Sequence, residues 1–128
     1  MIIKDTVAVV TGGTQGIGLA IAMDLAKKGS KVFVTARHDI SDDAVKEQIQ
    51  GLDINFKELD IRDDAKIGEL LNDIKEEFGH LDIIVNNAGI TKDKLLSRMS
   101  VEDFNDVIAT NLVGTFSMTK YAMKIMQK

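Results

Sequence analysis

Short apolar runs alternate with amphipathic segments along most of the chain. The runs cover residues 7–10, 31–35, 54–59 and 81–85 and are rich in Val, Ile, Leu and Phe. Runs of this length, bounded by Gly and polar residues, are typical of strands buried in a parallel sheet. The pattern therefore predicts four strands over these ranges.

The segments between the runs carry apolar residues at helical spacing. They predict helices over residues 16–28, 41–50 and 63–78, with Ser41 as the N-cap of the second and with Gly29 and Gly79 as stops of the first and third. Strands that alternate with helices of this length imply right-handed crossovers and a parallel sheet. We therefore expect one α/β domain over residues 1–128, a doubly wound sheet with strand order 3-2-1-4.

From Ser100 onward the chain is predicted to be largely helical, and Ser100 with Asp103 resembles a capping box. The terminal helix carries apolar residues on more than one side: Phe116, Met118, Ala122, Met123, Ile125 and Met126. Such a helix is usually buried all round, so a partner surface is implied. Because the sequence ends in this helix, we also expect the sheet to be truncated after its fourth strand.

Composition excludes several classes of function. A net charge of -4 without a dense run of Lys or Arg argues against a nucleic-acid partner. The absence of Cys removes thiolate catalysis and cysteine-ligated zinc, and His38 and His80 are interpreted as separate surface residues, so no metal site is expected. No apolar stretch approaches the roughly 20 residues of a membrane helix, and no signal-peptide pattern begins the chain. A cytoplasmic location is expected.

Three glycines, Gly12, Gly16 and Gly18, lie between the first strand and the first helix. Glycine permits a tight turn there and lets the backbone approach a pyrophosphate, which the N–H groups and dipole of the helix N-terminus stabilise. A purely structural turn is the alternative, but it needs only about one glycine. The spacing favours a Rossmann-like dinucleotide site.

The run TGGTQGIG at residues 11–18 and the run NNAG at 86–89 are similar to two motifs of short-chain dehydrogenases/reductases. This resemblance implies cofactor binding by Gly12, Thr14, Gln15, Gly16, Ile17, Gly18, Arg37, Asp60, Ile61, Asn87, Ala88 and Gly89. It further implies that Asp60 bonds the adenine amino group and that Asn111 is the catalytic asparagine. Within the family, residues 86–116 most resemble 3-oxoacyl-[acyl-carrier-protein] reductases, which implies an NADPH-dependent oxidoreductase of fatty acid biosynthesis.

Alternatives remain open for several of these residues. Asp60 could instead cap the following helix. In the loop after the fourth strand, Asn86 and Asn87 could simply bond to backbone groups, and Gly89 could simply let the chain turn. Cofactor choice depends on the end of the second strand, where a basic side chain accommodates a 2′-phosphate and an acidic one bonds the ribose. Arg37 favours NADP, while Asp39 leaves NAD as the weaker alternative.

The resemblance to this family also implies a particular proton donor, a tyrosine with a lysine four residues later. Tyr121 is the only tyrosine, and Ile125 stands four residues on, so Tyr121 is interpreted as an ordinary helical residue and enzyme activity of the chain alone is uncertain. The leading hypothesis is an NADP-binding half of a ketoacyl-type reductase that pairs as a homo-oligomer through the open edge at 81–85 or through the terminal helix. A non-catalytic nucleotide-binding or interaction module is the alternative. The substrate and the continuation past residue 128 are left open by the sequence.

Overall fold

The computed structural model describes residues 2–89 and 96–127. Four strands form one parallel sheet: β1 (Val7–Thr11), β2 (Lys31–Ala36), β3 (Ile54–Glu58) and β4 (Ile83–Val85). The sheet has the order β3-β2-β1-β4, and every pairing is parallel. The predicted order is confirmed. Part of the segment that resembles reductases, residues 90–95 of 86–116, lies outside the described residues.

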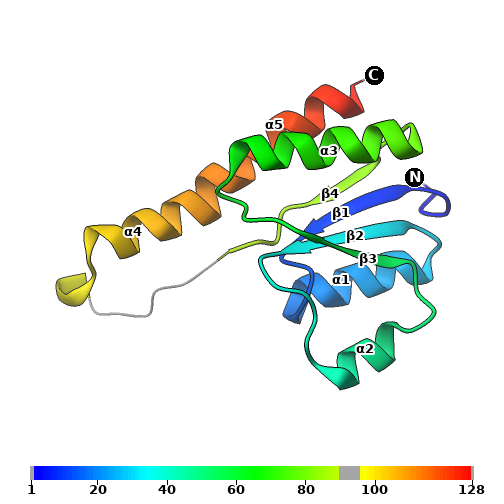
Figure 1. Ribbon diagram of the computed structural model, residues 1–128, viewed down its shortest axis with the longest axis horizontal. Coiled ribbons are helices and arrows are strands. Elements are labelled where there is room, and N and C mark those ends of the chain that lie inside the picture. Colours follow the sequence, from blue (N-terminus) through cyan, green and yellow to red (C-terminus); the bar gives the residue numbers. More distant parts are fainter. Residues whose placement is uncertain (1, 90–95, 128) are drawn as a thin grey trace.

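Helices cover both faces of the sheet (Figure 1). The helices α1 (Gly16–Lys27) and α2 (Asp43–Ile49) lie on one face, and α3 (Asp64–Phe78) and α5 (Gly114–Met126) lie on the other. The central strand β1 is buried along its whole length, because its side chains alternate between the two faces. This burial explains why the strand reads as a continuous apolar run.

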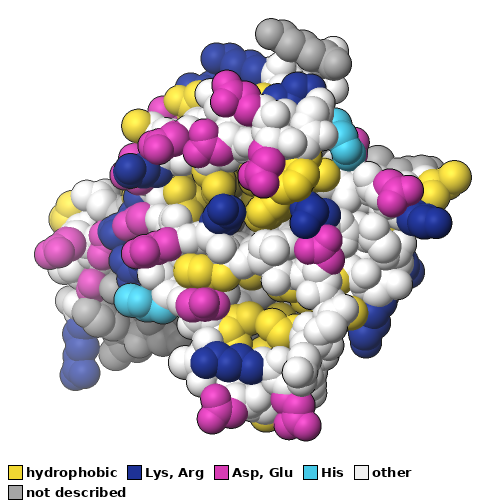
Figure 2. All heavy atoms as spheres, turned by 45° about the vertical axis from the view of Figure 1, so that its right-hand side comes forward, with side chains coloured by type: hydrophobic (Ala, Val, Ile, Leu, Met, Phe, Trp, Pro, Cys, Tyr) yellow, Lys and Arg dark blue, Asp and Glu magenta, His cyan; other side chains and the backbone are white. Residues whose placement is uncertain are grey.

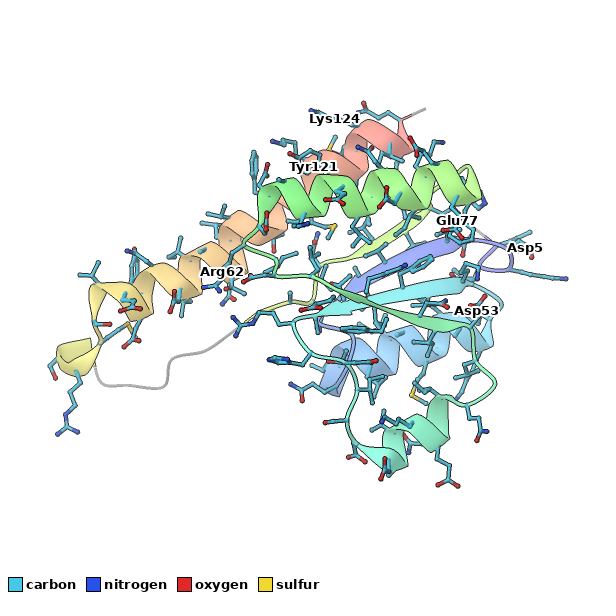
Figure 3. The ribbon with its side chains drawn as sticks, viewed as in Figure 1. Asp5, Asp53, Arg62, Glu77, Tyr121 and Lys124 are labelled. Carbon is cyan, nitrogen blue, oxygen red and sulfur yellow. The ribbon has the colours of Figure 1, made fainter. Side chains whose placement is uncertain are left out.

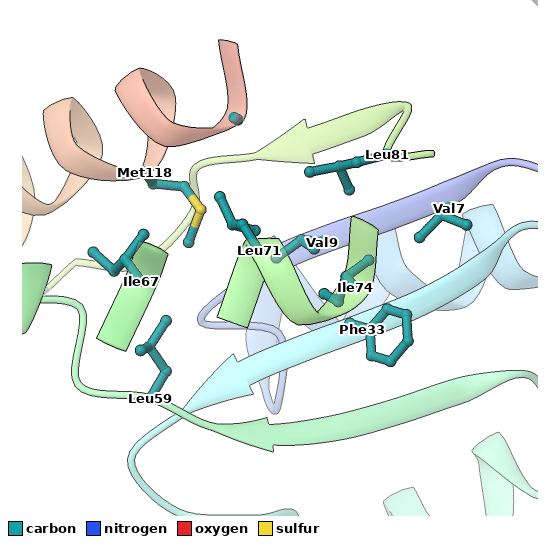
Figure 4. Packing of buried hydrophobic residues seen from close by; sticks show 10 residues of the cluster. Val7, Val9, Phe33, Leu59, Ile67, Leu71, Ile74, Leu81 and Met118 are labelled. Atoms are coloured by element: carbon teal, nitrogen blue, oxygen red, sulfur yellow. The ribbon is translucent and has the colours of Figure 1, made fainter. Parts of the chain in front are cut away.

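The larger of two hydrophobic clusters lies between the sheet and the α3–α5 pair (Figure 4). Its buried members are Val7, Val9, Phe33, Leu59, Ile67, Leu71, Ile74, Leu81, Met118 and Ala122. The smaller cluster, on the α1 face, consists of Ala8, Val10, Ala22, Val32 and Val34. Burial of this kind contributes about 25 cal/mol per Å² of apolar surface removed from water, so the two clusters stabilise the packing of the helices on the sheet.

The ends of the helices agree with the predicted stop at Gly79 and differ from the predicted cap at Ser41. Asp63 accepts from the Lys66 N–H at the start of α3, and Gly79 ends the helix with φ 81°. The N-cap of α2 is Asp42, which accepts from two backbone N–H groups, so the predicted cap at Ser41 is wrong. The correction has a physical reason, since a carboxylate at a helix N-terminus gains from the helix dipole as well as from the hydrogen bonds.

The chain after residue 95 is helical. A short 3₁₀ turn (Leu96–Arg98) precedes α4 (Val101–Ile108), and a π-helical turn (Ala109–Val113) joins α4 to α5. The capping box of Ser100 and Asp103 is present at the start of α4, as predicted. Figure 1 shows α4 extending away from the sheet.

The terminal helix is covered on one side only within the described residues. Met118 and Ala122 are buried against α3, whereas Phe116 and Met123 are 63% and 52% exposed. The chain by itself therefore covers only one side of this helix, and the partner surface that the sequence implied stays a prediction. The exposed residues still leave an apolar surface on α5, and β4, paired only with β1, is an outer strand among the described residues.

Candidate functional site

A cleft of about 670 Å³ opens at the carboxyl edge of the sheet. It is lined by Gly12, Thr14, Gln15, Thr35, Ala36, Arg37, His38, Asp39, Ile40, Ser41, Asp42, Val45, Leu59, Asp60, Ile61, Arg62, Ala88, Gly89, Asp106 and Thr110. Ligands of open α/β sheets bind at this edge, and the volume is within the usual range for small-molecule sites. Eight of the predicted binding residues thus meet in one cleft.

The glycine-rich turn lies at the start of α1. Gly12 and Gly16 have φ angles of +64° and +58°, a region in which a side chain is strained. A Cβ atom at Gly18 would collide with the carbonyl oxygen of Gly12, whereas one at Gly16 would meet no atom within 4 Å. A glycine is therefore needed at position 18 because a side chain would not fit there. At position 16 a glycine is favoured by the backbone conformation, and the space beside it is open.

The first turn of α1 has no side-chain cap. Gln15 occupies the N-cap position without a side-chain hydrogen bond, whereas α2, α3 and α4 are each capped by Asp or Ser. The N–H groups at the start of a helix need a partner, and together with the helix dipole they attract an anion. The structure thus leaves polar groups at the start of α1 without a protein side chain to cap them.

Thr11 holds the loop after β4 against the glycine-rich turn. Its Oγ1 accepts from the N–H groups of Asn87 and Ala88, both at 3.0 Å, and donates to the Val85 carbonyl at 3.3 Å. The Asn87 side chain in turn donates to the Gly12 carbonyl at 3.1 Å. Sequence reasoning did not single out Thr11, although a polar residue that ends an apolar run next to glycines is a usable signal.

Four of the predicted binding residues do not line the cleft: Gly16, Ile17, Gly18 and Asn87. Asn87 lies behind it and serves the loop, so the structural role that the sequence left open is present. Asn86 donates to the Thr119 hydroxyl on α5 at 3.1 Å. Asn111 is exposed on the π-helical turn, and its Oδ1 would lie 3.2 Å from a Cβ atom at Gly89. Asn111 is therefore close to the loop that borders the cleft, and π-helical turns frequently occur at functional sites.

Asp60 follows β3 and lies at the far side of the cleft from Gly12. Its carboxylate accepts from the Arg62 backbone N–H and from the Arg62 guanidinium. These hydrogen bonds, above all the one from the Arg62 side chain, lower the pKa of Asp60 from 3.8 to about 2. Because Asp63 caps α3, the interpretation of Asp60 as the helix cap is wrong.

Arg62 is a cleft residue that sequence reasoning missed. Besides Asp60, its guanidinium contacts the Asp106 carboxylate on α4, with Nη1 3.5 Å from Oδ1. Figure 3 shows Arg62 beyond the end of β3, on the side of α4. A signal was available in the sequence, since Arg two residues after an Asp that ends a strand can turn back to that carboxylate.

The end of β2 carries the residues that were expected to select the cofactor. Arg37 is exposed and lines the cleft, and its charge contributes to the lowered pKa of Asp60. The Asp39 carboxylate accepts from the N–H of its neighbour Ile40 at 2.6 Å. Figure 2 shows Lys and Arg side chains interspersed with Asp and Glu over the face that it views.

Tyr121 lies away from the cleft lining, in the α3–α5 pair. Its hydroxyl donates to the Asp64 carboxylate at 2.7 Å, and this hydrogen bond raises the pKa of Tyr121. Figure 3 shows Tyr121 and Lys124 on α5. A general acid that assists a developing alkoxide needs a pKa near the working pH, so this tyrosine is poorly suited to that task.

The described residues hold no group of three or more His, Asp or Glu side chains that could bind a metal ion. Among the helices that the structure describes, none has the length and apolar character to cross a lipid bilayer.

The sheet order and the cleft at its carboxyl edge define the Rossmann class of α/β folds. The family profile described as short chain dehydrogenase matches residues 6–128. The chain therefore belongs to the short-chain dehydrogenase family, which confirms the resemblance of its two sequence motifs.

Individual relatives agree with this assignment. The chain is 43% identical over 125 residues to the 3-oxoacyl-[acyl-carrier-protein] reductase FabG of Escherichia coli, covering 98% of this chain and 51% of that protein. It is 34% identical over 132 residues to the 3alpha-hydroxysteroid dehydrogenase of Mediterraneibacter gnavus, covering 100% of this chain and 53% of that protein. The chain thus spans about half the length of the curated relatives that it matches.

Solved structures give the same result. Ligand-free aldohexose dehydrogenase of Thermoplasma acidophilum superposes with a TM-score of 0.85 at 30% identity, covering 97% of this chain and 45% of that one. A variant of actinorhodin polyketide ketoreductase, solved with NADPH, superposes with a TM-score of 0.84 at 36% identity, covering 94% of this chain and 47% of that one.

Proposed function

We propose that this chain forms the NADP(H)-binding part of a reductase that reduces 3-oxoacyl-type ketones. The observation that carries the proposal is the cleft itself, which joins the uncapped start of α1 to the acidic end of β3. The identity to a 3-oxoacyl reductase supports the substrate class. A cytoplasmic location and a place in fatty acid biosynthesis belong to the same proposal.

The described residues fit a dinucleotide. The N–H groups at Gly16, Ile17 and Gly18 would hold the pyrophosphate, since no side chain caps them and the space beside Gly16 is open. Thr14 and Gln15 complete this loop beside the phosphates. The N-terminus is the positive end of the helix dipole, so it attracts the negative charge of the phosphates.

The two ends of the dinucleotide would lie on either side of that loop. Asp60 and Ile61 would hold the adenine, and Arg37 would pair with the 2′-phosphate. Asp39 is a weaker partner for a ribose hydroxyl, because one oxygen of its carboxylate already accepts from the Ile40 N–H. This arrangement supports NADP over NAD.

The nicotinamide end would lie near the loop after β4, where Ala88 and Gly89 line the cleft and Asn87 braces it from behind. When bound, the cofactor supplies a hydride for transfer to the ketone. Asn111, close to Gly89, would position groups at this end.

Proton donation is the step for which these residues offer no suitable group. Tyr121 is bonded to Asp64 and its pKa is raised, and the residue four positions later is Ile125. We propose that the chain by itself binds the dinucleotide without reducing ketones.

An interaction module that binds a nucleotide without catalysis is the second candidate. The exposed apolar residues of α5, together with the outer position of β4, favour it, because such surfaces typically mark contacts between subunits. A homo-oligomer formed through either surface is part of both candidates.

The glycine-rich turn provides the test of the binding site. Gly16→Val should abolish NADPH binding, because the added side chain would occupy the open space beside the helix N-terminus. The positive φ of Gly16 adds strain of roughly 1 to 2 kcal/mol, so far-UV circular dichroism must first show that the fold is retained. Gly51→Val is the matched control, because Gly51 is another positive-φ glycine with open space around it but lies in the turn between α2 and β3, away from the glycine-rich turn. Unchanged binding by Gly16→Val would assign the turn to a structural role.

A further inference from the structure

Arg62 fills most of the hydrogen-bonding capacity of Asp60. Its backbone N–H and its Nε both donate to Oδ1 at 3.0 Å, and its Nη2 donates to Oδ2 at 2.8 Å. An ionised carboxylate offers about four acceptor positions, two on each oxygen. Three are taken, so one position remains, and it is on Oδ2.

The environment of this pair keeps the carboxylate in place and ionised. Nη1 of Arg62 contacts Asp106 of α4 at 3.5 Å, so the guanidinium is held between two acids. Asp60 and Arg62 are each only partly exposed, with side chains 35% and 37% accessible. The low pKa of Asp60, to which Arg62 and Arg37 both contribute, means that this group accepts hydrogen bonds and does not donate them near neutral pH.

A single free acceptor position discriminates between purine bases. Adenine carries an amino group at C6, which donates, and an N1 that accepts, whereas a 6-oxo purine carries an acceptor at C6 and a proton on N1. A carbonyl in the place of the amino group is repelled by the carboxylate, and a carboxylate that is fixed in place does not shift toward N1 to accept its proton.

We propose that Arg62 is a positioning residue for base selection, which fixes the Asp60 carboxylate so that the cleft accepts a 6-amino purine and rejects a 6-oxo purine. This inference rests on the proposed dinucleotide function, and it adds to it the residue that sets the discrimination. Arg62 acts through Asp60, because its backbone N–H, its Nε and its Nη2 all donate to the Asp60 carboxylate.

The experiment compares the affinities of NADPH and of its reduced hypoxanthine analogue, which differ in the group at C6 and in the proton that the 6-oxo base carries on N1. Fluorescence titrations are made with the wild-type chain, Arg62→Ala, Arg62→Lys and Lys28→Ala. The measured quantity is the ratio of the two dissociation constants, since general weakening of the loop changes both constants but not their ratio.

The wild-type chain should prefer NADPH by about tenfold, the low end expected for one charge-assisted hydrogen bond. Arg62→Ala should reduce the ratio below about threefold, because the carboxylate is then free to rotate. Arg62→Lys should partly restore it, since Lys keeps the charge but lacks the planar fork. Lys28→Ala is the matched control and should keep the wild-type ratio, because Lys28 is also a cation paired with an Asp, Asp24, but neither residue lines the cleft.

Two results would overturn this inference alone: equal affinities in the wild-type chain, or an unchanged ratio in Arg62→Ala. Failure of the wild-type chain to bind either dinucleotide would instead overturn the proposed function and this inference with it.

Discussion

Arg37 provides the sharpest test of cofactor choice. It is the cationic side chain that directly follows β2, it lines the cleft, and its charge reaches Asp60 across that cleft. A 2′-phosphate paired with a guanidinium gains a charge-assisted hydrogen bond worth about 1.5 to 3 kcal/mol. Because Arg37 is exposed, the lower value applies, and it corresponds to roughly a tenfold difference in affinity.

The wild-type chain should therefore bind NADPH about tenfold more tightly than NADH, and Arg37→Ala should make the two affinities nearly equal. Fluorescence titrations at one fixed ionic strength measure both, since salt screens an exposed ion pair. Lys28→Ala is the matched control, because it removes the same charge at the far end of α1, where Lys28 pairs with Asp24. Equal affinities in the wild-type chain, or a preference that survives in Arg37→Ala, would refute this reasoning.

Three further predictions concern stability, catalysis and assembly. Because the pKa of folded Asp60 is lowered to about 2, its contribution to stability is complete above the unfolded value near 3.8 and is lost as the pH falls toward 2. Between these pH values, the free energy of unfolding measured with denaturant should fall more in the wild-type chain than in Asp60→Asn, by about 1 kcal/mol after allowance for partial exposure. Parallel plots of unfolding free energy against pH for the two chains would contradict this prediction. Tyr121→Phe should leave NADPH affinity unchanged within about twofold, and the chain should not oxidise NADPH with a small β-ketoester; turnover that Tyr121→Phe removes would show that Tyr121 is the proton donor. The chain should self-associate at micromolar concentration, and Phe116→Ser with Met123→Ser should weaken this association because both side chains are exposed on α5; a wild-type chain that stays monomeric in light scattering would contradict it.

The strands and their order could be predicted because the buried strands leave a direct pattern in the sequence. Val7 to Val10 face helices on both sides, so every position is apolar, and the alternation with helices then restricts the topology. Helix ends were harder to place. Ser41 and Asp42 are adjacent and both can cap a helix, and only the backbone decides which side-chain oxygen reaches the N–H groups of residues 44 and 45.

The terminal helix shows a second limit of sequence patterns. Phe116 and Met118 are both apolar, but only Met118 packs against α3. A wide apolar face predicts burial without saying how much of it this chain covers.

The site could be predicted where one short segment carries the signal. The glycine-rich turn and the Asp at the end of β3 are each visible in a few neighbouring residues. The hydrogen bonds from the loop after β4 to Thr11 and the contact between Arg62 and Asp106 could not be predicted in the same way, because they join segments that are distant in sequence. Their roles depend on the packing of β4 beside β1 and of α4 beside the cleft.

The most direct test of the central claim is the mapping of NADPH onto the chain by amide chemical shifts in NMR. The account predicts saturable changes at residues 12–18, 37, 60–62 and 87–89, the segments that meet at the carboxyl edge of the sheet. Changes at the exposed face of α5 should be absent or independent of NADPH concentration. Saturable shifts confined to α3 and α5, or no shifts at millimolar NADPH, would contradict the claim that this cleft is a dinucleotide site.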